Sequence, residues 1–218
     1  MENIDGSNLT IVIQAGGESK RMGSNKSLMT FLGAPLVMRG VNRLLPACSE
    51  MVVTTNEPEK MGFLDAYVES GKLRLASDGT DARGALVGMR TAFSSATNPY
   101  VALVACDMVF PSSSLILHLK ERLENEGADV AIPRTSHGYE PFHAVYRRST
   151  CLEAVERAIA AGEKRATSWI DSLATIEVGE EEIFKVHPRG GAFVNVNTPE
   201  ELHDLEQRII RGEITSAG

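Results

Sequence analysis

A glycine-rich, basic segment follows the first apolar stretch of the chain. Its sequence over residues 15–26 is AGGESKRMGSNK. Between Ser19 and Lys26 it carries three basic residues and no acidic one, although the formal net charge of the chain is −7. Paired glycines leave backbone N–H groups uncovered and let a ligand approach the main chain. Such a loop suits a polyphosphate, and the competing interpretation is a solvated surface turn of common composition.

Two widespread phosphate-binding motifs do not fit this segment. The Walker A pattern GxxxxGK[ST] needs four residues between its glycines, whereas five separate Gly17 from Gly23, and Ser24 comes next. The dinucleotide fingerprint GxGxxG is absent too. If the segment binds phosphate, it belongs to another class of loop.

An acidic residue ends the clearest apolar run of the chain. Tyr100–Cys106 is seven residues long and stops at Asp107. Mg²⁺ prefers hard oxygen ligands, often one or two carboxylates together with substrate phosphates. Asp107 is therefore a candidate magnesium ligand. The structural alternative is a helix N-cap or turn aspartate ahead of Pro111.

Short apolar strands and amphipathic helices alternate over the first part of the chain, and they must position these residues. The expected strands are Leu9–Gln14, Met51–Thr55, Leu73–Ala76 and Val101–Cys106, and the expected helices are Pro35–Leu45, Gly84–Phe93 and Leu115–Leu123. Strands separated by helices predict βαβ units and a mainly parallel sheet covered on both faces, a three-layer Rossmann-like α/β fold. Ligands bind such sheets at the carboxyl ends of the strands.

The pattern changes after about Gly127. The expected strands there are Ala128–Pro133 and Glu140–Tyr146, and a helix is expected over Cys151–Ala161. Thr198, Pro199 and Glu201 supply an N-cap, a first-turn proline and a capping-box glutamate for a last helix that ends at Ile210. With no repeat or linker, residues 1–218 are predicted to form a single domain.

Composition excludes several broad classes of protein. The 218 residues are 43% hydrophobic and 23% charged, and the acidic balance argues against a general nucleic-acid or membrane-surface binder. The N-terminus lacks the basic region of a signal peptide, and a membrane-spanning helix needs about 20 apolar residues. Cys48, Cys106 and Cys151 form no CxxC pair, which offers no zinc site and fits a reducing cytoplasm.

The segment AGGxSxRMGxxK after an apolar strand resembles the loop of the MobA-like nucleotidyltransferases, and within that family the molybdenum cofactor guanylyltransferases. The resemblance extends along most of the chain. It includes Asp78 with GALVGM at 84–89, VACD at 104–107 and NVNTPEEL at 195–202. Gly16-Gly17 is usual in guanylyltransferase members, whereas Gln14 stands where the family usually has leucine.

The resemblance assigns a nucleotide site to about residues 1–127. Lys26 would bind the triphosphate with help from Arg21, and Asp107 would bind Mg²⁺. The implied catalytic residues are Arg21, Lys26 and Asp107, and the implied nucleotide-binding residues are Gln14, Ala15, Gly16, Gly17, Lys26, Thr54, Asn56, Asp78, Gly84 and Asp107. For residues 84–89 the alternative is a core helix that begins at a glycine.

The resemblance assigns an acceptor site to residues 128–218. The implied contacts to the acceptor or its phosphate are Asn195, Asn197, Glu140, Lys164 and Arg165, with His143 as a further suggested contact. The alternatives are ordinary polar residues of a strand for Glu140 and His143, and a solvated basic pair for Lys164 and Arg165. Alternation along a strand would place Asn195 and Asn197 on one face, although turn-forming asparagines before a capped helix are the alternative. Trp169 is expected to pack beneath the preceding helix.

The implied reaction is Mg²⁺-dependent transfer of GMP from GTP to the terminal phosphate of molybdopterin, with release of pyrophosphate. The alternatives are a molybdopterin cytidylyltransferase, another NTP:phosphate-acceptor nucleotidyltransferase such as a sugar-phosphate enzyme, and a non-catalytic nucleotide-binding module. The expected partners are the two substrates and other proteins of molybdenum cofactor biosynthesis, with neither nucleic acid nor membrane. The expected location is the cytoplasm.

Overall fold

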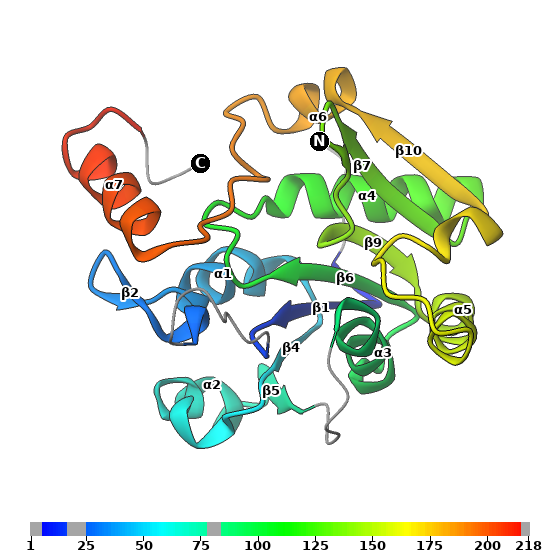
Figure 1. The fold of residues 1–218 in the computed structure, drawn as a ribbon, viewed down its shortest axis with the longest axis horizontal. Coiled ribbons are helices and arrows are strands. Elements are labelled where there is room, and N and C mark those ends of the chain that lie inside the picture. The colour runs from blue at the N-terminus through cyan, green and yellow to red at the C-terminus, as the bar shows by residue number, and fades with distance from the viewer. Residues whose placement is uncertain (1–5, 17–24, 78–83, 215–218) are drawn as a thin grey trace.

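One mixed sheet forms the centre of the molecule. The computed structural model describes residues 6–16, 25–77 and 84–214. Within them, eight strands form the sheet, in the order β10-β7-β9-β6-β1-β4-β5 with β8 paired to β7 (Figure 1). The strands are β1 Leu9–Gln14, β4 Glu50–Thr54, β5 Leu73–Ala76, β6 Tyr100–Ala105, β7 Val130–Thr135, β8 Gly138–Tyr139, β9 His143–Arg147 and β10 Thr175–Gly179. A separate hairpin pairs β2 Thr30–Phe31 with β3 Ala34–Pro35.

The sheet is mainly parallel, as the alternation of strands and helices predicts. β1 pairs in parallel with both β4 and β6, and β4 pairs in parallel with β5. β9 is inserted antiparallel between β6 and β7. Gln14 at the end of β1 is in register with Thr54 of β4 and Ala105 of β6. The carboxyl ends of three parallel strands therefore meet at one edge.

Helices cover both faces of the sheet. The α-helices are α1 Val37–Leu44, α2 Asp65–Glu69, α3 Ala85–Ser95, α4 Ser113–Glu126, α5 Arg148–Ala160, α6 Glu180–Val186 and α7 Pro199–Ile210. The 3₁₀ helices are η1 Lys26–Leu28, η2 Leu45–Ala47, η3 Pro58–Lys60, η4 Gly62–Leu64 and η5 Ile170–Ser172. Buried side chains of α1, α4 and α6 form one core with the sheet, and those of α3 and α5 form a second core with it. Those of α7 belong to a third, smaller cluster with Phe31 and Val109. This confirms the expected three-layer α/β fold.

The two cores follow from the alternation of side chains along the strands. In β1, Ile11 and Ile13 belong to the core beneath α1 and α4, and Val12 belongs to the core beneath α3 and α5. Trp169 lies in the second core, 3% exposed, and packs against Phe93 of α3. The expected burial of this tryptophan is confirmed.

The strands predicted at Met51–Thr55, Val101–Cys106 and Ala128–Pro133 are shifted by one or two residues in the structure, and two other predictions differ more. The strand expected over Glu140–Tyr146 begins only at His143, because the preceding residues form a turn in which the His143 N–H donates to the Glu140 carbonyl at 3.1 Å. The segment with Asn195 and Asn197 forms no strand, only one isolated bridge between Asn195 and Met108. Asn195 and Asn197 therefore do not owe their common direction to a strand of the sheet.

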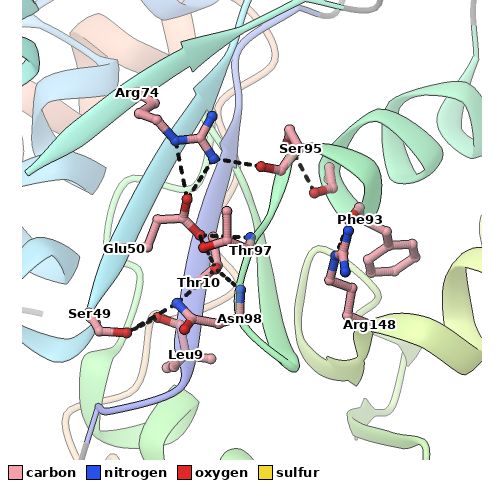
Figure 2. Close-up of polar contacts among 11 residues, drawn as sticks. Leu9, Thr10, Ser49, Glu50, Arg74, Phe93, Ser95, Thr97, Asn98 and Arg148 are labelled. Carbon is pink, nitrogen blue, oxygen red and sulfur yellow. Dashed lines mark hydrogen bonds and ion pairs between the residues drawn. The ribbon is translucent and has the colours of Figure 1, made fainter. Parts of the chain in front are cut away.

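A polar network ties the amino-terminal ends of β1 and β4 to the chain before β6 (Figure 2). The Glu50 carboxylate accepts hydrogen bonds from Thr10, Arg74 and the Thr97 N–H. The Asn98 side chain donates to the Thr10 hydroxyl at 3.1 Å. This end of the sheet is thus closed by satisfied polar contacts.

No helix of the described residues is long and apolar enough to cross a membrane.

Candidate functional site

Lys26, Asp107 and Asn197 meet at the carboxyl edge of the sheet. The Lys26 Nζ lies 3.1 Å from Oδ2 of Asp107 and 3.1 Å from Oδ1 of Asn197. The Lys26 and Asp107 side chains are 16% and 22% exposed. The contacts link three predicted site residues that lie far apart in the sequence, and a partly exposed ammonium beside a carboxylate can bind phosphate and metal together.

Asn25 and Glu57 hold the start of the helix that carries Lys26. The Asn25 Oδ1 accepts from the backbone N–H and the hydroxyl of Ser27, at 3.1 and 2.7 Å, and so caps η1. Its Nδ2 donates to Glu57 at 2.9 Å. Sequence reasoning missed both residues. An asparagine just before a predicted phosphate-binding lysine was a usable signal, because asparagine is a preferred N-cap residue, but nothing local identified Glu57.

Asp107 lies two residues after the end of β6, and a second segment packs beside it. The Val196 N–H donates to the Asp107 carbonyl at 3.1 Å, and the Val109 N–H donates to the Val194 carbonyl at 3.2 Å. Val196 is 3% exposed, whereas Asn195 and Asn197 on either side of it are exposed. Burial of Val196, in place of membership of a strand, therefore directs both asparagines outward.

The start of α7 fixes the backbone of Asn197. The Thr198 hydroxyl accepts from the Glu201 N–H at 3.1 Å, which confirms the predicted N-cap. The Glu201 carboxylate accepts from the N–H of Asn197 at 2.6 Å. The capping-box prediction placed this bond at Thr198, one residue later. The bond to Glu201 therefore joins α7 directly to Asn197, which also contacts Lys26.

The turn after β1 lies next to β4. The Ala15 N–H donates to the Thr54 carbonyl at 2.8 Å, and the Asn56 Nδ2 donates to the Gly16 carbonyl at 3.1 Å. A Cβ on Gly16 would lie 3.4 Å from this Nδ2. The Thr54 side chain is buried, because the residue is only 5% exposed, so Thr54 takes part in this edge through its backbone carbonyl. Four of the predicted nucleotide-binding residues are therefore neighbours.

Gly84 and Gln14 approach the same edge from α3 and β1. Gly84 precedes α3 with φ of 136°, a conformation that favours glycine. The amide of Gln14 lies against Gly88 of α3. Three other predicted site residues, Gly17, Arg21 and Asp78, lie outside the described residues, so their assignment stays a prediction.

The structure does not connect the predicted acceptor residues beyond Gly127 to the Lys26 cluster. Glu140 is half-buried and accepts from the Thr135 hydroxyl at 3.2 Å, and burial raises the pKa of its carboxyl group. Lys164 and Arg165 are exposed in the loop after α5. No hydrogen bond or ion pair within residues 6–16, 25–77 and 84–214 joins these three side chains to Lys26, Asp107 or Asn197.

His143 is not available to a substrate, which corrects its suggested role. It is fully buried, and its Nε2 accepts from the Ser112 N–H at 2.9 Å. Burial, followed by the neighbouring His187, lowers the pKa of His143 to about 4. Its ring packs edge-on against Phe193, with 5.6 Å between ring centroids. His143 thus supports the segment that leads to Asn195 and Asn197.

The chemistry of the Lys26 cluster is electrostatic. Burial, and then the adjacent Asp107, raises the pKa of the Cys106 thiol to about 12, so this cysteine is no thiolate nucleophile at neutral pH. The described residues contain no group of three or more His, Cys, Asp or Glu side chains that could hold a metal ion. A divalent ion here would depend on Asp107, amide oxygens and substrate phosphates, a donor set that suits Mg²⁺.

Comparison with known proteins points to one family. Residues 11–177 match the model of the MobA-like NTP transferase domain. A probable molybdenum cofactor guanylyltransferase of Natronomonas pharaonis is 35% identical over 92% of this chain and 98% of its own length. A molybdenum cofactor guanylyltransferase of Desulfosudis oleivorans is 32% identical over 95% of this chain and 98% of its own length.

Solved structures share the fold. The crystal structure of molybdopterin-guanine dinucleotide biosynthesis protein A from Archaeoglobus fulgidus matches with a TM-score of 0.77 and 22% identity, over 94% of this chain and all of that one. The 4-diphosphocytidyl-2C-methyl-D-erythritol synthase of Anaerococcus prevotii matches with a TM-score of 0.67 and 13% identity, over 95% of this chain and 98% of that one. At these identities the similarity concerns the arrangement of the chain.

Proposed function

Because the chain belongs to the MobA-like NTP transferase family, we propose that it transfers GMP from GTP to the terminal phosphate of molybdopterin. Membership of this family means that the chain is a nucleotidyltransferase. The base and the acceptor are taken from the names of relatives that match nearly their whole length. The observation that carries the proposal is the convergence of Lys26, Asp107 and Asn197 beside the turn at Gly16.

The reaction is an in-line displacement at the α-phosphorus of GTP. An oxygen of the acceptor phosphate forms the new bond to this phosphorus, and the bond from the α-phosphorus to the oxygen that bridges to the β-phosphorus breaks. Pyrophosphate leaves with that oxygen and its electron pair. The attacking phosphate is already ionised, so no general base is needed. Such a transfer depends on positioning and on neutralising charge.

Lys26 and Arg21 would hold the β- and γ-phosphates, together with backbone N–H groups of the loop that includes Gly17. Asp107 would hold Mg²⁺, with amide oxygens of Asn195 or Asn197 near it. When bound, the ion would offset the negative charge that develops on the pyrophosphate. The Lys26–Asp107 distance of 3.1 Å supports this arrangement, since both groups must lie near the same phosphates.

The two substrates would occupy opposite halves of the domain. We assign the nucleotide to about residues 1–127, where Ala15, Gly16, Thr54 and Asn56 are neighbours. The other residues assigned to the nucleotide are Gln14, Asp78 and Gly84. We assign the acceptor to residues 128–218, with Glu140, Lys164 and Arg165 as its contacts. We also place the reaction in the cytoplasm, because a reducing compartment keeps the free cysteines Cys48, Cys106 and Cys151 as thiols.

Pyrophosphate release that requires added molybdopterin tests the proposal. The purified protein is incubated with Mg²⁺ and GTP, CTP, ATP or UTP, with and without molybdopterin, and with other molybdenum cofactor biosynthesis proteins in a further arm. Release with GTP and molybdopterin alone supports the proposal. Release with CTP identifies a cytidylyltransferase. Release only with a different phosphate acceptor, such as a sugar phosphate, shows that this compound and not molybdopterin is the acceptor. Nucleotide binding without release in any arm identifies a non-catalytic module.

A further inference from the structure

His187 is a buried histidine to which the proposed reaction assigns no role. It is the C-cap residue of α6 and is 7% exposed. Both of its ring nitrogens have partners, because Nδ1 lies 3.0 Å from the hydroxyl oxygen of Ser112 and Nε2 lies 2.6 Å from the carbonyl oxygen of Gly190. Ser112 is the N-cap of α4, and Gly190 belongs to the connection between α6 and α7. The ring therefore joins two connections that are distant in the sequence.

The two partners determine which end of the ring donates. A carbonyl oxygen can only accept a hydrogen bond, so Nε2 carries the proton and donates it to Gly190. In the neutral ring Nδ1 is then the acceptor, and the Ser112 hydroxyl donates to it. The Oγ of Ser112 also accepts from the N–H of Leu115 at 3.2 Å, which caps α4. The donor end of His187 thus holds the connection to α7, and its acceptor end holds the start of α4.

The segment 190–197 leads from this ring to the Lys26 cluster. Gly190 has a φ of 66°, in the left-handed region that favours glycine, and its N–H donates to the His187 carbonyl at 3.1 Å, so the chain turns there. At the other end of the segment, the Oδ1 of Asn197 lies 3.1 Å from the Nζ of Lys26. The hydrogen bond from His187 therefore fixes the turn from which the segment starts.

The same segment lies along the connection between β6 and α4. Backbone hydrogen bonds of 3.1 and 3.2 Å join Val196 to Asp107 and Val194 to Val109. Ser112 ends this connection, so the imidazole attaches the segment to it at a third place. Three attachments along one connection define the position of the segment better than the two backbone bonds alone.

We propose that His187 is a positioning residue, which sets the place of Asn197 beside Lys26 by linking the turn at Gly190 to the N-cap of α4. The inference rests on the proposed function, since the effect on turnover passes through Asn197 and the phosphates that Lys26 would bind. The ring itself is enclosed, so it acts through the segment and not on a substrate. A buried hydrogen-bonding group that loses its partner is costly, so the turn at Gly190 shifts when the donor end of the ring is lost.

Two substitutions separate the two ends of the ring. His187→Gln places an amide N–H near the position of Nε2 and keeps a donor for Gly190, whereas His187→Asn places an amide oxygen near Nδ1 and keeps only an acceptor for Ser112. His187→Asn is expected to lower kcat/KM for pyrophosphate release about three- to tenfold, the value of one hydrogen bond, and His187→Gln about twofold or less. The exposed His203→Asn on α7 is the matched control and should keep the rate of the wild type.

A double-mutant comparison shows whether the effect passes through Asn197. In an Asn197→Ala background, His187→Asn should lower kcat/KM about twofold or less, because the side chain that it positions is already gone. A merely structural role of His187 predicts the same three- to tenfold loss in both backgrounds, and that result would overturn the inference. An equal loss of rate in His187→Gln and His187→Asn would overturn it too, because the bond to Gly190 would then not matter.

Amide hydrogen exchange tests the attachment without any turnover. The N–H of Val196 donates to the Asp107 carbonyl, and its exchange should be at least about tenfold faster in His187→Asn and unchanged in His187→Gln and His203→Asn. Unchanged exchange in His187→Asn would overturn the inference. Failure of the proposed function has a different signature, because the wild-type protein itself would then release no pyrophosphate in any arm. The exchange comparison still decides in that case whether His187 positions the segment.

Discussion

The Nζ of Lys26 lies 3.1 Å from the Oδ2 of Asp107, although 81 positions separate the two residues in the sequence. The same atom lies 3.1 Å from Asn197, at a separation of 171 positions. One ammonium group therefore connects the end of the glycine-rich segment, the end of β6 and the start of α7. We expect substrate phosphates to bind where these three elements meet.

Replacing Lys26 should remove most of the catalysis and little of the stability. Lys26→Met is expected to lower kcat/KM about 100- to 1,000-fold, because the variant loses a charge aimed at the phosphates. The free energy of unfolding should change by about 1 kcal/mol or less, since the ion pair is partly exposed. Pyrophosphate release and urea denaturation measure the two effects. Lys185→Met, which breaks an exposed pair with Glu181 on α6, should leave the rate unchanged.

Removing the charge of Asp107 should weaken the use of magnesium. Asp107→Asn keeps the size of the side chain, so the fold should persist while the rate falls at least about 100-fold. The Mg²⁺ concentration that gives half of the maximal rate should rise. A magnesium titration of pyrophosphate release measures both, with the exposed Asp171→Asn as the control. Wild-type turnover and magnesium dependence in Asp107→Asn would rule out Asp107 as the metal ligand.

Asn197 should act through Lys26. Asn197→Ala and Lys26→Met are expected to be non-additive in kcat/KM, with a coupling of about 0.5–3 kcal/mol, because both remove the same hydrogen bond. A double-mutant cycle measures this coupling. Asn195→Ala, whose side chain makes no bond to Lys26 in the described structure, should couple more weakly to Lys26→Met. Equal coupling for the two asparagines would contradict a specific role for Asn197.

Buried His143 should make stability depend on pH in a defined window. Its pKa is lowered from 6.5 to about 4 in the folded chain, by burial and then by His187. Between these values the unfolded chain binds more protons, so stability falls as the pH drops from 6.5 towards 4. The steepest slope is about 1.4 kcal/mol per pH unit. Urea unfolding at pH 7, 6, 5 and 4.5 should show it.

His143→Gln should flatten this slope, because glutamine offers the Ser112 N–H an acceptor and does not titrate. The exposed His137→Gln is the matched control and should keep the slope of the wild type. An equal slope in His143→Gln would place the responsible proton on another group.

The Glu50 network should stabilise the fold without affecting turnover (Figure 2). Burial raises the pKa of Glu50, but hydrogen bonds from Thr10, Arg74 and Thr97 outweigh it and hold the pKa below 4.5. This stability is present above pH 4.5 and is lost as the pH falls below that value. Glu50→Gln should therefore cost about 1–3 kcal/mol at pH 7, and less in acid.

Denaturation at pH 7 and pH 4 compares Glu50→Gln with the wild type, and the exposed Glu69→Gln serves as control. A loss of turnover in Glu50→Gln would mean that the amino-terminal end of the sheet influences the site at the opposite end.

Local patterns predicted most of the elements. The strands expected at Leu9–Gln14 and Leu73–Ala76 have the same bounds in the structure, and the helix expected over Gly84–Phe93 is α3 with Gly84 before its first turn. Apolar periodicity and caps depend on near neighbours, so the sequence expresses them directly. The same holds for α7, whose N-cap Thr198 was visible in the sequence.

Other features depended on partners distant in the sequence. Asn195 and Asn197 are both exposed, but because Val196 is buried beside Asp107 and not because they belong to a strand. His143 appeared as a polar residue near an acceptor site, yet the packing of β9 beneath α4 buries it. The pairing of Asn25 with Glu57 likewise had no local signal.

By itself, the sequence determined which residue types stand at the ends of which strands. A basic, glycine-rich loop after β1, an aspartate after β6 and asparagines before α7 predicted a phosphate-transfer site and indicated the family. The tertiary structure decided which of them touch, because it places the start of η1 beside the segment after β6, with the Nζ of Lys26 3.1 Å from Asp107. It also enclosed the amide of Gln14 under Gly88. Contacts of this kind depend on how segments distant in the sequence pack together, and local propensity carries no information about that packing.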